Sequence, residues 1–133
     1  MKTQTLFVSV FALVILQACN ETTGPKVNCN LPTVERGFML VSVVDSLSGS
    51  TIANGVTVTA IHGKAFDSEI WPDLPSYASR PVPVAAREAG KYDLYVTKTF
   101  YKPLVIRNVL VKEDACGTLP TNVTARLQRM NVD

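Results

Sequence analysis

Three cysteines and one histidine carry the most reactive side chains of this chain: Cys19, Cys29, Cys116 and His62. A catalytic dithiol usually has its two cysteines close together, as in C-x-x-C, and that spacing does not occur here. His62 ends a predicted strand beside Gly63, where either a general base or an edge histidine with satisfied hydrogen bonds could stand, and we favour the edge histidine. The sequence therefore predicts no catalytic residues and no enzyme.

The segment 63–88 holds the other groups that could bind a ligand. They are three acids and three aromatic residues, Asp67, Glu69, Asp73, Phe66, Trp71 and Tyr77. Calcium prefers clustered oxygen ligands, but these acids lack the glycine and the order of a calcium loop. We interpret them as a solvated acidic loop and predict no metal site. The aromatic residues are the candidate ligand or partner site, with the alternative that Trp71 caps an open end of the fold.

The backbone of 63–88 is expected to be irregular. Four prolines between positions 72 and 83 argue against a long helix or a central strand, although a short strand at 82–86 is compatible with them. A connection of this length in a compact domain is usually functional. We therefore expect a loop that is either a binding site or a structural cap.

The stretch 38–61 is predicted to hold two strands joined by a polar turn over 45–55. The first run is apolar on both faces, and the second alternates valine and alanine with threonine, the period of a half-buried strand. Ile52 is expected to pack from the turn onto the core. Further strands are predicted at 92–97, at 104–111 with a bulge or bend at Arg107 and Asn108, and at 123–128.

Residues 1–18 have the pattern of an export signal: Lys2, then an apolar run over 6–16 that is shorter than the ~20 residues needed to span a bilayer. The end of this segment, Leu-Gln-Ala-Cys, resembles the lipobox of bacterial lipoproteins. That resemblance implies cleavage before Cys19 and acylation of Cys19, including palmitate, with residues 19–36 as a tether. Asn20 stands where an aspartate favours inner-membrane retention, which favours the outer membrane in a Gram-negative host. The alternative is an ordinary secretory signal.

With Cys19 lipidated, Cys29 and Cys116 remain as an even pair in an oxidising compartment, and we predict a disulfide between them. Closing so long a loop contributes about 4 kcal/mol in the chain-entropy account. The alternative, a zinc site, would need four ligands, and two thiols with His62 are too few.

Two motifs resemble the carboxypeptidase regulatory-like domain family, whose members are transthyretin-like β-sandwiches. The first is similar to the opening hairpin of that family and has Asp45, Ser48, Gly49, Ile52, Asn54, Gly55, Val56 and Val58. The second, A-G-K-Y-D-L-Y-V, spans 89–96. Family members usually continue with a Gly-Tyr pair, whereas this chain has Phe100 and Tyr101. The resemblance covers 37–129, leaves 130–133 as a tail, and implies a fold but no activity.

Strand spacing and Gly/Pro turns predict one all-β domain, a transthyretin-like or Ig-like sandwich. The net charge of +2 is too small to favour nucleic acid as a partner. The sequence thus predicts a lipid-anchored envelope protein whose non-catalytic domain binds or scaffolds. Its partners would be the membrane and an envelope protein or carbohydrate, with no cofactor. The alternative is a small periplasmic enzyme that uses His62 with Asp67 or Glu69.

Overall fold

The structure is a computed structural model that describes Cys29 and residues 36–131. The predicted signal, Cys19, most of the tether and the last two residues of the predicted tail lie outside the described residues. The secondary structure consists of β1 (Phe38–Asp45), β2 (Thr57–His62), β3 (Ala65–Ile70), η1 (Pro75–Tyr77), β4 (Val82–Ala85), β5 (Gly90–Thr97), β6 (Leu104–Val111), β7 (Glu113–Asp114), β8 (Gly117–Thr118) and β9 (Thr121–Leu127).

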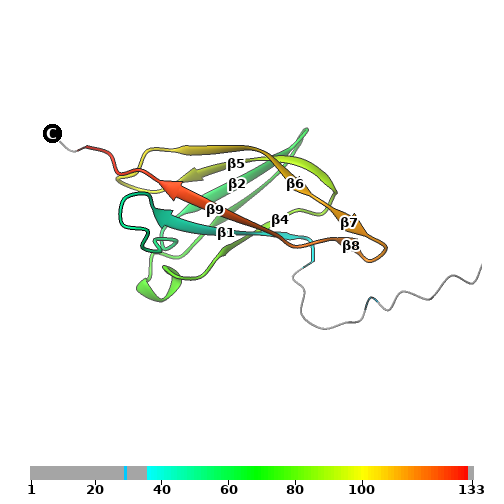
Figure 1. Ribbon diagram of the computed structural model, residues 1–133, viewed down its shortest axis with the longest axis horizontal. Coiled ribbons are helices and arrows are strands. Elements are labelled where there is room, and N and C mark those ends of the chain that lie inside the picture. The colour runs from blue at the N-terminus through cyan, green and yellow to red at the C-terminus, as the bar shows by residue number, and fades with distance from the viewer. Residues whose placement is uncertain (1–28, 30–35, 132–133) are drawn as a thin grey trace, which may run out of the picture.

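Two sheets pack face to face, which confirms the predicted all-β sandwich (Figure 1). One sheet has the order β4-β1-β9 and the other the order β3-β2-β5-β6. β1 and β9 are parallel, and the other pairs within these sheets are antiparallel. The short β7–β8 hairpin lies at one end of the sandwich, and the C-terminal end of β9 lies at the other (Figure 1).

Alternating side chains of both sheets form the core. Val58 and Ala60 of β2 point inward while Thr57 and Thr59, which alternate with them, are half-buried, as the period of two predicts. Leu94 of β5 and Leu127 of β9 are fully buried from opposite sheets. Ile52 is partly buried against the same cluster, which confirms that prediction.

The two strands of the stretch 38–61 do not pair with each other, so the expected opening hairpin is wrong. β1 and β2 belong to different sheets, and the connection over 45–55 crosses from one sheet to the other. After the turn, the chain pairs with β1 at a single antiparallel bridge, between Thr51 and Val44. Ala53 then donates its backbone N–H to Ala78, at 3.0 Å, which leads the chain away from β1.

The prediction of an irregular segment 63–88 is wrong for its first part. Ala65 to Ile70 form β3, which pairs with β2 through a tight turn at Gly63. β3 is an edge strand, and its side chains are either half-buried or exposed. Its sequence therefore lacks the alternation of apolar and polar residues that predicts a strand.

The predicted short strand at 82–86 is confirmed as β4, which is also an edge strand. Pro83 lies opposite Leu40 of β1. Ala85 donates its backbone N–H to the Asp67 carboxylate of β3 at 2.9 Å. Proline is tolerated at a sheet edge because that position needs no partner for an N–H group.

The predicted strands at 92–97, 104–111 and 123–128 correspond to β5, β6 and β9. The predicted irregularity in β6 is confirmed, because the register shifts between Tyr92 and Leu94 of its neighbour and Asn108 has a φ of 58°. Asp93 holds the bulge by accepting hydrogen bonds from the Asn108 backbone N–H (3.0 Å) and from Arg107 (3.2 Å).

Asp45 joins three distant parts of the chain at one end of the sandwich. One carboxylate oxygen accepts backbone N–H bonds from Leu47 (2.9 Å) and Ser48 (3.0 Å) in the turn after β1. The other accepts the Tyr101 hydroxyl (3.0 Å) and Arg129 Nε (2.8 Å). The Ser48 N–H and the Arg129 guanidinium, the two largest causes, hold the pKa of Asp45 well below its usual range.

Candidate functional site

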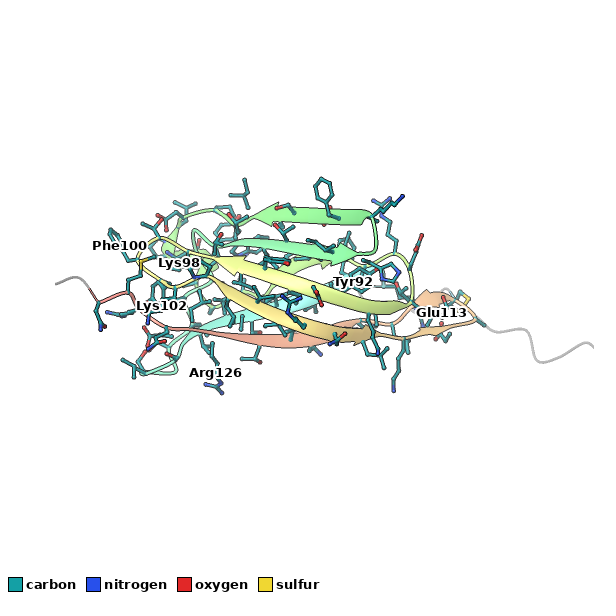
Figure 2. All side chains as sticks on the ribbon, turned by 90° about the horizontal axis from the view of Figure 1, so that it is seen from above. Tyr92, Lys98, Phe100, Lys102, Glu113 and Arg126 are labelled. Atoms are coloured by element: carbon teal, nitrogen blue, oxygen red, sulfur yellow. A yellow bond between two sulfur atoms is a disulfide. The ribbon has the colours of Figure 1, made fainter. Side chains whose placement is uncertain are left out.

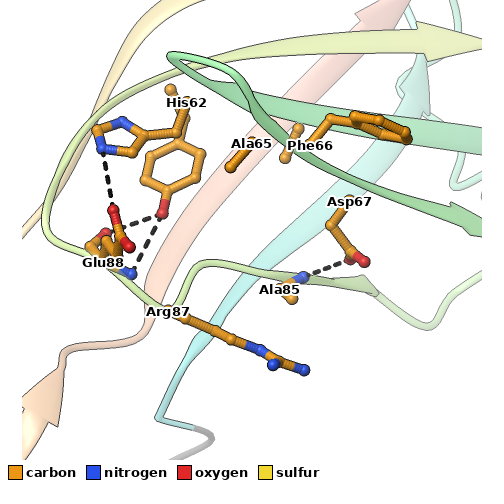
Figure 3. Close-up of a pocket in the computed structure, with 9 residues that line it drawn as sticks. His62, Ala65, Phe66, Asp67, Ala85, Arg87 and Glu88 are labelled. Atoms are coloured by element: carbon orange, nitrogen blue, oxygen red, sulfur yellow. Dashed lines mark hydrogen bonds and ion pairs between the residues drawn. The ribbon is translucent and has the colours of Figure 1, made fainter.

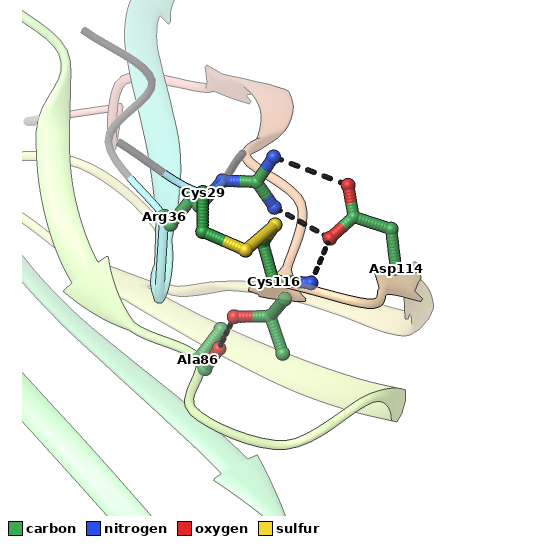
Figure 4. A network of polar contacts seen from close by, with 6 residues as sticks. Cys29, Arg36, Ala86, Asp114 and Cys116 are labelled. Atoms are coloured by element: carbon green, nitrogen blue, oxygen red, sulfur yellow. Dashed lines mark hydrogen bonds and ion pairs between the residues drawn. A yellow bond between two sulfur atoms is a disulfide. The ribbon is translucent and has the colours of Figure 1, made fainter. Parts of the chain in front are cut away.

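A disulfide between Cys29 and Cys116 joins the segment before β1 to the tip of the β7–β8 hairpin, as predicted (Figure 4). The two Cα atoms lie 5.4 Å apart. Arg36 makes two hydrogen bonds to Asp114 beside it, at 2.7 and 3.1 Å, and the Cys116 backbone N–H donates to the same carboxylate at 2.8 Å. The Arg36 guanidinium is the main reason why the pKa of Asp114 lies below its usual value.

The candidate binding site is a cavity of about 350 Å³ between the β2–β3 turn and the segment that joins β4 to β5 (Figure 3). Its volume is in the range of small-molecule sites. It is lined by Ala60, His62, Ala65, Phe66, Asp67, Ala85, Arg87, Glu88 and Tyr92.

His62 is held in place by contacts on two sides of its ring. The ring stacks on Tyr92 with centroids 4.7 Å apart, and Nδ1 lies 2.9 Å from the backbone oxygen of Lys91. Gly90 makes room for it: its φ is +141°, and a Cβ there would lie 2.5 Å from the imidazole. The Tyr92 hydroxyl in turn donates to the backbone oxygen of Glu88 at 2.8 Å, which fixes the next wall of the cavity.

The acid beside His62 is Glu88, whose Oε2 lies 3.7 Å from Nε2, and not Asp67 or Glu69 as the enzyme alternative expected. Asp67 lines the same cavity but binds the backbone of β4. Sequence reasoning missed Glu88 because it lies 26 positions from His62, beyond β3 and β4. Arg87 and Tyr92 were missed as cavity residues for the same reason.

The three predicted aromatic residues do not form one site. Phe66 borders the cavity and is 76% exposed. Trp71 is partly buried against the core, its ring contacts Tyr77 edge-to-face at 5.1 Å, and its indole N–H donates to the Tyr77 backbone oxygen at 3.3 Å. These contacts favour the structural alternative for Trp71, that it caps the sandwich.

We expect Trp71→Ala to lower the free energy of unfolding by about 2 kcal/mol, because a half-buried indole loses its packing and its hydrogen bond. The control is Phe66→Ala, which removes an exposed ring and should change stability by no more than about 0.5 kcal/mol. Urea denaturation of both variants measures the difference. Equal and small effects would show that Trp71 does not support the fold and would return it to the candidate binding residues.

Neither a metal site nor a membrane-spanning helix is found in the part of the chain that the structure describes. No group of three or more His, Cys, Asp or Glu side chains among residues 36–131 and Cys29 could hold a metal ion. No described helix is long and apolar enough to cross a bilayer. Asp73, one of the three acids considered for calcium, instead accepts a hydrogen bond from the Asn54 amide at 2.8 Å.

Comparison with known protein families finds no family that matches this chain, and comparison with curated protein sequences finds no match either. The resemblance of two motifs to carboxypeptidase regulatory-like domains therefore stays a prediction.

Proposed function

We propose that this protein is a bacterial envelope lipoprotein, anchored through acylated Cys19, whose β-sandwich is a non-catalytic module that binds a ligand or a partner. The observation that carries the proposal is the disulfide between Cys29 and Cys116. Disulfides persist in oxidising compartments outside the cytoplasm, which is where an export signal would send the chain. With those two sulfurs joined, Cys19 is the cysteine left for acylation.

Two motif residues support the proposed membership of the carboxypeptidase regulatory-like family. Phe100 lies in the loop between β5 and β6 (Figure 2), at the position where the family usually has glycine. Its φ of 67° is in the left-handed region that favours glycine. The next residue, Tyr101, donates its hydroxyl to Asp45, the first residue of the other motif. The positions that the family pattern emphasises therefore have physical roles in this sandwich.

The cavity favours binding over catalysis as the role of the domain. Its nine lining residues include no serine, threonine, cysteine or lysine beside His62, which leaves the carboxylates of Asp67 and Glu88 as the candidate nucleophiles. The stacked ring of His62 and its backbone hydrogen bond fix its orientation, which suits a group that holds a ligand. A small enzyme that uses His62 with Glu88 is the second candidate function, favoured by the 3.7 Å approach of that pair in a concave site.

Mass spectrometry of the mature protein purified from its membrane tests the proposed anchor. The expected result is an N-terminus at Cys19 that carries acyl chains, while a Cys19→Ser variant carries none and leaves the membrane fraction. A Cys29→Ser variant is the matched control and should keep its lipid. An unacylated wild-type N-terminus, or a leader that is still attached, would contradict the proposed anchor.

A further inference from the structure

We propose that the cavity at His62 binds small molecules that carry a primary ammonium group on an apolar body. This inference rests on the proposed binding role of the sandwich and names the chemistry of its ligand. It follows from three features of the cavity: the hydrogen-bonding state of His62, the position of Glu88, and the distribution of charged and apolar groups around them.

The hydrogen bond of His62 leaves an acceptor facing the cavity. Nδ1 lies 2.9 Å from the Lys91 backbone oxygen, and a carbonyl oxygen can only accept, so Nδ1 carries the proton. The other nitrogen, Nε2, then has a free lone pair in the neutral imidazole. Stacking on Tyr92 and the close approach of Gly90 keep the ring from turning.

Glu88 places a second acceptor next to the first. Its Oε2 lies 3.7 Å from Nε2, longer than a hydrogen bond, and with a neutral ring neither atom can donate to the other. A donor nitrogen can lie at a hydrogen-bonding distance of roughly 2.8 Å from both atoms at once. An ammonium group, which has several N–H donors and a positive charge, satisfies this pair better than a hydroxyl group does.

The remaining walls favour a cation with an apolar body. Asp67 adds a second carboxylate, of which only one oxygen accepts the Ala85 N–H. Arg87, the cationic residue of the lining, extends away from the His62–Glu88 pair (Figure 3). The methyl groups of Ala60 and Ala65 with the Tyr92 ring give the cavity an apolar surface. Burial of an apolar body there adds affinity, while the acceptors select the charged end.

The test compares three probes of similar shape: 2-phenylethylamine, 2-phenylethanol and 3-phenylpropanoate. Each is titrated into the full-length mature protein in detergent, with calorimetry for affinity and NMR shifts of the Ala65 and Ala85 amides to locate binding. We expect the amine to bind at least about tenfold more tightly than the alcohol or the carboxylate, the difference typical of a charge-assisted hydrogen bond.

Glu88→Gln should weaken amine binding by about tenfold or more, because it removes the charge but keeps the size of the side chain. The backbone bonds between Glu88 and Tyr92 do not use that side chain, so the fold should be kept. Glu113→Gln removes the same charge from β7, outside the cavity lining, and should leave amine binding unchanged.

Asp67→Asn is a second variant, since an asparagine oxygen can still accept the Ala85 N–H, and it should also weaken amine binding. Carboxylate binding equal to amine binding, shifts confined to residues outside the cavity, or unchanged affinity in both Glu88→Gln and Asp67→Asn would each overturn the proposal. These results do not depend on the lipid, whose absence would show separately in the mass of the N-terminus.

Discussion

Replacing Cys29 and Cys116 together by serine should lower the free energy of unfolding by about 4 kcal/mol. The disulfide closes a loop with a sequence separation of 87 residues, which includes seven of the nine strands, β1 to β7. Its main effect is on the unfolded chain, whose conformational entropy rises when the link is lost. A domain of this size has a total stability of only about 5–15 kcal/mol, so a large fraction would be lost.

Urea denaturation of the wild type, of the double serine variant and of the wild type under reductant measures this effect. Reduction and substitution should agree, because both remove the same covalent link. Arg36→Gln is the matched control: it removes the exposed contacts of Arg36 with Asp114 and keeps the disulfide, and its effect should be clearly smaller. A loss below about 1 kcal/mol in the double variant would mean that the unfolded chain is not restrained by this link.

The strands and the core of the sandwich could be predicted from the sequence because their signal is local. In β2, β5 and β9 buried side chains alternate with more exposed ones, which reflects a strand with one face in a core. β1 was predicted instead from a short apolar run with several valines. The bulge in β6 was also readable, since Arg107 and Asn108 interrupt an apolar run. The disulfide was predicted by counting the cysteines of a chain that the sequence predicts to be exported.

The sheet to which each strand belongs could not be read in the same way. The side chains of β2 alternate in the same way whether β2 pairs with β1 or lies in the opposite sheet. The sequence of 45–55 therefore does not indicate that this connection crosses between the sheets. β3 escaped prediction because an edge strand buries little, and Phe66 and Ile70 are about three-quarters exposed. The segment thus looked like a loop, although it supplies a wall of the cavity.

The candidate site depended still more on tertiary structure. His62 stood out because it is the single histidine, but its contact Glu88 is brought to it by the path of the chain through β3 and β4. Gly90 also acts only in three dimensions, since its lack of a Cβ matters because the imidazole lies against it. Residue type alone identified His62, whereas Glu88 and Gly90 belong to the site only because the fold brings them next to it.

The substitution Asp45→Asn is expected to be among the most destabilising single changes in the domain, and to reduce the dependence of stability on pH in acid. Asp45 is 2% exposed, and all four of its partners are donors. The NH₂ group of an asparagine would face donors on one side, so hydrogen bonds would be lost whichever way the amide turns. The connection after β1, the β5–β6 loop and Arg129 would lose their common link.

The direction of the pH effect follows from the lowered pKa of Asp45. A carboxyl group whose pKa is lower in the folded state than in the unfolded chain contributes stability that is fully present above the unfolded value of about 3.9. That contribution is lost as the pH falls through the folded-state pKa. The wild type should therefore lose stability below about pH 4, whereas the asparagine variant should start lower at neutral pH and lose less on acidification.

Thermal unfolding of both proteins between about pH 2 and pH 7 measures this difference. Asp93→Asn is the matched control, because Asp93 also accepts a backbone N–H and an arginine but lies in β5 beside the bulge of β6, with its side chain 32% exposed, so that water can replace the lost contacts. Its effect should be smaller than that of Asp45→Asn at every pH. Equal losses in the two variants, or a difference between wild type and Asp45→Asn that stays constant down to about pH 2, would show that the buried carboxylate does not link these segments as an ionised group.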